Sequence, residues 1–186
     1  MIRFNRIQNI YSPVAIRNNI NNYPGADVYK DASLTAEFIW GNLSKLYQNC
    51  VNPILDAFGN KVRITSAYKS CEVEKILGGN QNSQHTRGYA IDLVSVSHPS
   101  SLLWNWCFQN LPSWNQLIWE YPEKGDFITN TLDFSWIHIS YIPGNNPKLT
   151  SISSKREDLH EMYKNQKTNK IGNYTHGINL ADNTLI

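Results

Sequence analysis

The sequence contains few charged residues. Asp, Glu, Lys and Arg make up 17% of the 186 residues, against about 25% in an average soluble domain. Lysine and arginine outnumber aspartate and glutamate by 17 to 15, so the net charge is +2 with histidine neutral. Proteins that bind nucleic acid through its phosphates need a basic patch or stripe. This composition therefore argues against a nucleic-acid-binding protein.

Long apolar runs are also absent. No stretch reaches the about 18 consecutive apolar residues that a transmembrane helix needs, so we expect no membrane span. In residues 1–22 an Arg or Asn interrupts the apolar residues every two or three positions, which leaves no hydrophobic region of a secretory signal. We therefore expect synthesis in the cytoplasm, in a host cell or otherwise, without a signal peptide.

Cysteine is scarce as well. The chain has three cysteines, Cys50, Cys71 and Cys107. Their odd number and wide spacing exclude a disulfide framework and a CxxC zinc site. We expect them to be small buried thiols in a protein made in a reducing compartment.

What the sequence does have is a globular composition. Hydrophobic residues account for 41% and aromatic residues for 12%, while 23 asparagines supply much of the polarity. This composition argues against intrinsic disorder. The length suits one domain of roughly 100–150 residues with extensions.

The hydrophobic periodicity predicts short helices and strands in mixed order. Apolar residues three and four apart predict a helix from a cap at Ser33 to a stop at Gly59, kinked or restarted at Pro53. Further helices are expected over 71–77 and 99–110, and strands from residue 62 onward and over 90–94, 116–121 and 134–141. This order predicts an α+β fold in which helices flank a small antiparallel sheet.

The ends of the chain differ from this central region. We expect a compact domain over residues 33–146, a polar N-terminal extension over 1–32 and a polar C-terminal extension over 147–186. The C-terminal extension has one weak helical stretch near residues 155–165 and then a tail rich in Asn, Gly and Thr.

The densest group of polar residues lies between Ser83 and Asp92. His85 and Asp92 are seven positions apart, so an unbroken strand would point them to opposite faces. Gly88 between them permits a turn or bulge that brings both side chains together. With a further histidine, they would make three ligands of a catalytic zinc. His138, among apolar residues in a predicted strand, is either that ligand or a buried core residue.

These motifs resemble those of the zinc D-alanyl-D-alanine carboxypeptidases and of their phage relatives, the L-alanyl-D-glutamate endopeptidases. The resemblance covers about residues 34–142. It is carried, in chain order, by Thr65-Ser66-Ala67-Tyr68-Lys69-Ser70, Gly78-Gly79, Ser83-Gln84-His85-x-x-Gly88-x-Ala90-x-Asp92, Asn115-Gln116-Leu117-Ile118-Trp119-Glu120 and Trp136-Ile137-His138-Ile139-Ser140.

The resemblance implies a hedgehog/DD-peptidase-like fold and a zinc site. His85, Asp92 and His138 match the zinc ligands of the family, and Ser83 matches a position that lines the substrate cleft. Lys69 stands where the family usually has an arginine that grips a substrate carboxylate or carbonyl. Lysine keeps the charge but loses the two-pronged hydrogen bonding of arginine.

The general base departs from the family pattern. Many relatives have an acidic residue where this chain has Ser135, and a serine hydroxyl cannot take a proton from water near neutral pH. If the last two strands pair about a midpoint near residues 127–128, Glu120 lies opposite Ser135 and can take over this role. Asp133 is the fallback.

The resemblance implies a zinc-dependent peptidase that hydrolyses the stem peptide of peptidoglycan. Such an enzyme would act at the bacterial cell wall as a phage lysis enzyme or a virion-associated protein, with its extensions binding other virion subunits. The alternative is a catalytically impaired structural or wall-binding virion protein that retains the fold. Ser135 and Lys69 favour this alternative.

Overall fold

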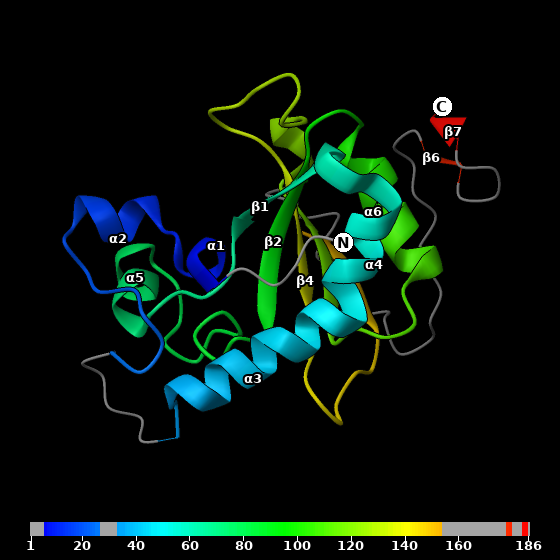
Figure 1. Cartoon of the computed structure of the whole chain (residues 1–186). Coiled ribbons are helices and arrows are strands. Elements are labelled where there is room, and N and C mark those ends of the chain that lie inside the picture. The colour runs from blue at the N-terminus through cyan, green and yellow to red at the C-terminus, as the bar shows by residue number, and fades with distance from the viewer. Residues whose placement is uncertain (1–5, 27–32, 154–177, 180–183, 186) are drawn as a thin grey trace.

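The fold is built on one five-stranded sheet with the strand order β1-β2-β4-β3-β5. Figure 1 shows the computed structural model, which describes residues 6–26, 33–153, 178–179 and 184–185. The strands are β1 (Val62–Ser66), β2 (Ala90–Ser95), β3 (Gln116–Glu120), β4 (Trp136–Ser140) and β5 (Leu149–Ser153). Helices flank this sheet, so the predicted α+β class is confirmed.

The sheet is mixed. Strands β1, β2, β4 and β3 pair antiparallel, as expected, whereas β5 pairs parallel to β3. Strand β5 was not predicted from the sequence. Leu149 and Ile152 are the only large apolar residues in this polar strand, and they show no period-two alternation. The sheet thus extends past residue 146 to Ser153, while the division of the chain into three segments stays a prediction. Two further short strands, β6 (Ile178–Asn179) and β7 (Thr184–Leu185), pair with each other.

The predicted helix before the sheet consists of three consecutive pieces. They are α3 (Ala36–Leu46), the π-helix η1 (Tyr47–Val51) and α4 (Asn52–Phe58). Thr35, not Ser33, is the N-cap, because its hydroxyl accepts the N–H of Phe38. The irregularity lies in η1, just before Pro53, which occupies the first turn of α4. Gly59 ends α4 with a φ of 60°, as expected.

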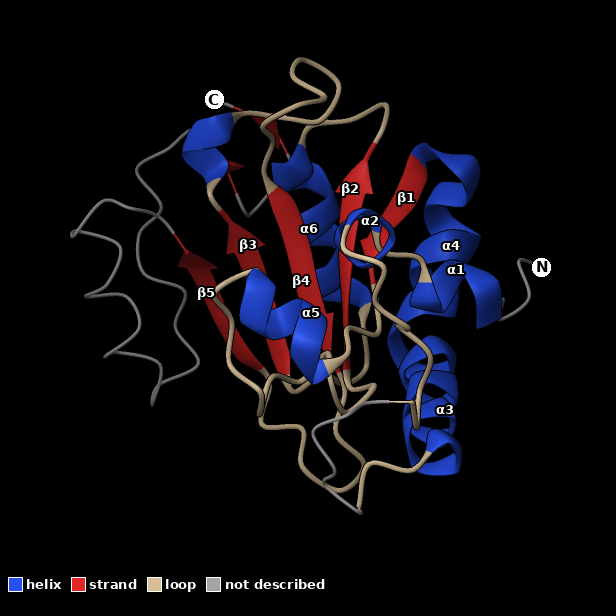
Figure 2. Cartoon of the chain, turned by 90° about the vertical axis from the view of Figure 1, so that its left-hand side faces the viewer, coloured by secondary structure: helices blue, strands red, loops and turns tan. Residues whose placement is uncertain are grey.

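The remaining helices are short apart from α6 (Ser100–Asn110), where Pro99 is the N-cap rather than the first helical residue. They are α1 (Arg6–Ile10), α2 (Pro13–Arg17), α5 (Cys71–Ile76) and the 3-10 turns η2 (Gly59–Lys61) and η3 (Pro122–Lys124). Figure 2 shows α6 behind the sheet and α5 and α2 in front of it. None of the described helices is long and apolar enough to cross a membrane. The helical stretch predicted near residues 155–165 lies outside the described residues.

Alternate residues of the central strands form the hydrophobic core. Their side chains are fully buried and pack with α3, α4 and α6; they are Ile91, Leu93, Leu117, Ile137 and Ile139. Successive side chains of a strand point to opposite faces, so Asp92 and His138 point to the other face. The three cysteines are free and buried, which confirms that they form no disulfide.

The N-terminal helices are tied to the loop between β1 and α5. The amide of Asn22 donates to the carbonyls of Ile10 and Tyr68, and its oxygen accepts the N–H of Ser70 at 2.7 Å. The carbonyl of Asn9 accepts the N–H of Tyr68 at 3.0 Å. Both backbone neighbours of Lys69 are therefore fixed.

Candidate metal centre

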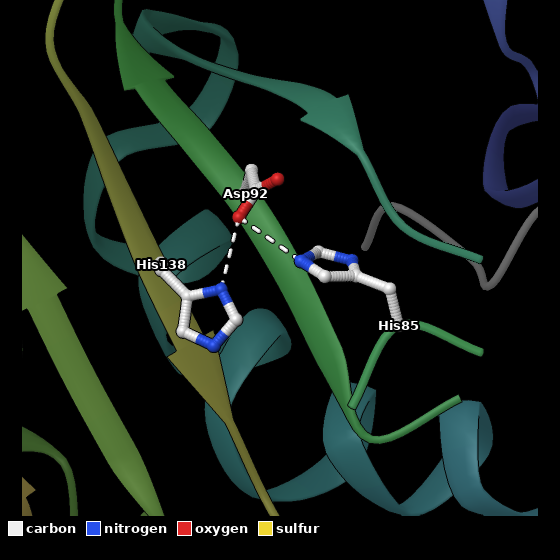
Figure 3. A group of neighbouring side chains, drawn as sticks. All are labelled: His85, Asp92 and His138. Carbon is white, nitrogen blue, oxygen red and sulfur yellow. Dashed lines mark hydrogen bonds and ion pairs between the residues drawn. The ribbon is translucent and has the colours of Figure 1, made fainter. Parts of the chain in front are cut away.

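Three side chains predicted to bind zinc come together on the face of the sheet opposite α6. His85, Asp92 and His138 each offer one ligand atom, and these atoms all lie within 4.8 Å of one another. Figure 3 shows both imidazole rings directed at one oxygen of Asp92. His85 Nε2 lies 3.4 Å and His138 Nδ1 lies 3.1 Å from Asp92 Oδ1. Two donor atoms bonded tetrahedrally to one zinc would lie about 3.4 Å apart, so these distances fit a shared metal.

Strand register and one tight turn produce this convergence. Asp92 of β2 and His138 of β4 are direct partners in the antiparallel ladder, so their side chains share a face. His85 precedes β2 in a turn closed by Gly88, which has a φ of 69°. A Cβ at Gly88 would lie 2.5 Å from the carbonyl oxygen of Ile39. Glycine is thus required both for the turn, as predicted, and for the close approach of α3.

The proton of His85 is held away from the cluster. His85 Nδ1 lies 2.6 Å from the carbonyl oxygen of Ala67. A carbonyl oxygen only accepts hydrogen bonds, so Nδ1 carries the proton and donates it. Nε2, which faces Asp92, therefore has a free electron pair in the neutral imidazole. This outer contact is typical of metal-binding histidines.

A chain of amides holds the proton of His138 in the same way. The carbonyl of Asn145 accepts from Asn115 Nδ2 at 2.7 Å, so the oxygen of Asn115 faces Gln84 and accepts from its Nε2 at 2.8 Å. The oxygen of Gln84 is consequently turned toward His138 Nε2, at 3.4 Å. Nε2 is then the donor, and Nδ1 keeps a free electron pair toward Asp92.

In these tautomers the three inner atoms are all electron-pair donors, so they could hold a cation between them. Burial by itself would raise the pKa of Asp92, but positive charge on His85 and His138 when these rings are protonated, together with the ammonium group of Lys69, holds it well below its ordinary value. Asp92 is thus a carboxylate. Two imidazole nitrogens and a carboxylate oxygen, with a fourth position open, are a ligand set of catalytic zinc sites, so the residues present fit that metal.

A second layer of charge lies around the cluster. Lys69 Nζ is 3.3 Å from Asp92 Oδ2 and 3.9 Å from Glu74 Oε1. The hydroxyl of Ser83 donates to Glu74 Oε1 at 3.0 Å and accepts the backbone N–H of His85 at 3.2 Å. Both residues predicted to bind substrate thus lie beside the metal ligands. Glu74 was not predicted from the sequence, because nothing in the spacing of α5 distinguishes it from its neighbour Glu72.

The structure corrects the register assumed for Glu120. Glu120 pairs with Trp136 instead of Ser135, and the direct partner of His138 on β3 is Ile118. Glu120 is half-buried and two positions from Ile118, so it lies on the same face as His138. Such diagonal neighbours have Cβ atoms roughly 7–8 Å apart. Glu120 therefore borders the cluster without belonging to it.

The other two positions considered for the base have different surroundings. Ser135 is fully buried, and its hydroxyl bonds that of Ser100 at the start of α6. Asp133 is exposed and forms an ion pair of 2.7 Å with Lys124. This contact raises the pKa of Lys124 above its ordinary value, chiefly through the hydrogen bond that its ammonium group donates to Asp133.

An α+β domain that holds two histidines and an aspartate in this arrangement has the architecture of a metal-dependent hydrolase. Residues 30–118 match the family model described as Peptidase M15, so over this segment the chain is similar to that family. This match confirms the resemblance inferred from the motifs and supports a metallopeptidase. The match includes His85 and Asp92, whereas His138 lies beyond it and joins the site through β4. No curated protein matches the chain.

Proposed function

We propose that the protein is a zinc-dependent peptidase that hydrolyses a peptide bond in the stem peptide of peptidoglycan. The observation that carries this proposal is the convergence of three electron-pair donors, His85 Nε2, His138 Nδ1 and Asp92 Oδ1, in a chain that is similar to the peptidase M15 family. The resemblance to cell-wall peptidases, carried by motifs within the matched segment and after it, supports the substrate class.

Peptide hydrolysis requires a water oxygen to attack the scissile carbonyl carbon while the C–N bond breaks. A bound zinc would polarise that carbonyl and lower the pKa of the attacking water. We assign the general base to Glu120, which takes the proton from water and delivers it to the leaving amine, directly or through one further water. Asp133 is the weaker candidate, because it already pairs with Lys124 in an exposed loop. His85 and His138 keep their electron pairs inward because Ala67 and Gln84 hold their protons.

The place of action follows from the same resemblance. We propose that the protein acts at the bacterial cell wall, as a phage lysis enzyme or as a component of a virion, where the terminal extensions would contact other subunits. The resemblance of the motifs to those of phage endopeptidases supports this assignment. The scissile bond is D-Ala–D-Ala in one branch of these relatives and L-Ala–D-Glu in the other.

Digestion of purified peptidoglycan by the zinc-loaded protein tests this function. Mass spectrometry of the released fragments should show stem peptides cut at one bond. A chelator should abolish the cleavage, and added zinc should restore it. Stoichiometric zinc binding with no cleavage of any stem peptide would contradict the proposal and favour the catalytically impaired, wall-binding alternative.

A further inference from the structure

Glu74 is a buried carboxylate to which the proposed chemistry gives no role. It lies on α5, in front of the sheet, with 6% of its surface exposed. Burying a carboxylate costs several kcal/mol unless it is paired and hydrogen-bonded. Its partners therefore show what this charge does in the fold.

Both oxygens of the Glu74 carboxylate are closely surrounded by other groups. Oε1 accepts the hydroxyl of Ser83 at 3.0 Å and lies 3.9 Å from Lys69 Nζ. Oε2 lies against the backbone of Gly79, where an added Cβ would be only 2.0 Å away. The backbone N–H of Gly79 also bonds the carbonyl of Glu74 at 2.8 Å. The carboxylate can reach both partners only because residue 79 has no side chain.

Each partner of Glu74 in turn contacts one of the predicted metal ligands. Lys69 Nζ contacts Asp92 Oδ2, the oxygen that the histidines do not use. Ser83 Oγ accepts the backbone N–H of His85. One carboxylate thus connects the outer supports of two ligands, and Asp92 Oδ1 remains directed at the metal position.

In this arrangement the positive charge of Lys69 is already paired with carboxylates of the protein itself. Its side chain is 17% exposed, and its ammonium group faces two carboxylates, those of Asp92 and Glu74. A carboxypeptidase binds the terminal carboxylate of its substrate with a cation. A third carboxylate at Lys69 would meet one positive charge and two negative charges, which is unfavourable in a partly buried site.

We propose that Glu74 is a positioning residue that commits Lys69 to Asp92 and Ser83 to His85, so that Lys69 does not bind a substrate carboxylate and the site takes internal peptide bonds. The part about internal bonds rests on the proposed peptidase function. Glu74 acts through Lys69 and Ser83, and it touches neither substrate nor metal.

Zinc affinity tests the positioning role without any activity assay. Glu74→Gln should weaken zinc binding by about 10–100-fold, the usual effect of losing an outer support of a metal ligand. Gly79→Ala should weaken it in the same direction, because it displaces the carboxylate without removing the charge. Glu72→Gln is the matched control, since it removes the same charge from the same helix, and its zinc affinity should stay within about twofold of wild type.

A double-mutant cycle tests whether Glu74 acts through Lys69. In a Lys69→Met background, Glu74→Gln should have less effect on zinc affinity than in the wild type. If Glu74→Gln matches Glu72→Gln, or if its effect is unchanged in the Lys69→Met background, the positioning role is overturned.

Binding of two matched peptides tests the commitment of Lys69. The probes are N-acetylated stem peptides that differ only in a free or an amidated carboxyl group next to the scissile bond, titrated calorimetrically into the zinc-loaded full chain. Wild type should bind the amide at least as tightly as the acid. Glu74→Gln should shift the preference toward the acid by at least about tenfold, the scale of one charged hydrogen bond.

The outcomes separate the two proposals. A wild-type preference for the acid, or no binding of either peptide, overturns the commitment of Lys69. The commitment of Lys69 is also overturned if Glu74→Gln shifts the preference toward the acid equally strongly in a Lys69→Met background. The expected binding results without cleavage of peptidoglycan would support the role of Glu74 and count against the proposed peptidase function alone.

Discussion

Asp92 and His138 are direct cross-strand partners in the two central strands, β2 and β4, although they are 46 residues apart in the sequence. Their shared face depends on register, because a slip of one residue would turn one of the two side chains to the opposite face. The fully buried side chains of Ile137 and Ile139 on the core face fix this register. The packing of the core therefore keeps these two candidate ligands on one face of the sheet.

The first prediction concerns the amide that orients His138. Gln84→Ala removes the acceptor of His138 Nε2, so the ring can exchange its proton between both nitrogens and turn. We expect zinc affinity to fall by about 10–100-fold. Gln81→Ala, at an exposed position three residues earlier, should leave the affinity unchanged. Competition with a chromogenic chelator measures both variants, and equal affinities would exclude an orienting role for Gln84.

The second prediction concerns the turn that carries His85. Gly88→Ala introduces a left-handed backbone cost of roughly 1–2 kcal/mol and a contact of 2.5 Å with the carbonyl of Ile39. We expect a loss of stability larger than this backbone cost, together with weaker zinc binding. Gly144→Ala is the control, because Gly144 has a φ of 79° and no atom within 4 Å of an added Cβ. Thermal unfolding of both variants should show the larger loss in Gly88→Ala.

The third prediction concerns the general base. Glu120→Gln keeps the size of the side chain but removes the proton acceptor, so turnover on peptidoglycan should fall by about 10²–10⁴-fold while zinc content is unchanged. Asp133→Asn breaks an exposed ion pair and should have little effect. Steady-state rates with metal analysis of the same samples give the comparison. Full activity of Glu120→Gln would place the base elsewhere.

The fourth prediction concerns the extent of the domain. A chain that ends at residue 146 lacks β5 and the buried Ile152, whose burial contributes about 2 kcal/mol. Its melting temperature should fall by roughly 4–8 °C or more. A chain that ends at residue 153 keeps the whole five-stranded sheet and should match the full chain in melting temperature and zinc content. Equal melting temperatures for the two truncated chains would show that β5 adds no stability.

Much of this fold follows from local patterns in the sequence. Apolar periodicity locates the helices and central strands, since burial of alternate residues such as Ile137 and Ile139 leaves a clear signal. The turn at Gly88 is also predictable, because its φ of 69° is open to glycine and to few other residues. The polar strand β5 is not predictable in this way, because only Ile152 of its large apolar residues is buried.

The residues of the candidate site were predictable where a sequence motif fixes the residue types. They were not predictable where contacts between distant segments determine which residues lie at the site. His85, Asp92 and His138 lie in such motifs, and the structure brings them together. The register of β3 and β4 depends on the loop between them, so the partner of Glu120 was wrong by one residue. Glu74 depends on Lys69, Ser83 and the missing side chain of Gly79, which no single spacing reveals.

The three buried cysteines affect how the protein withstands a change of redox surroundings. Burial raises the pKa of Cys50 to about 12, and it also raises the pKa of Cys107. Thiolates, the species that oxidise and exchange disulfides, are therefore scarce while the core is closed. The candidate metal centre offers only nitrogen and oxygen donors and no cysteine. While the domain is folded, Cys50 and Cys107 are thus protected from oxidation in reducing and in oxidising surroundings alike.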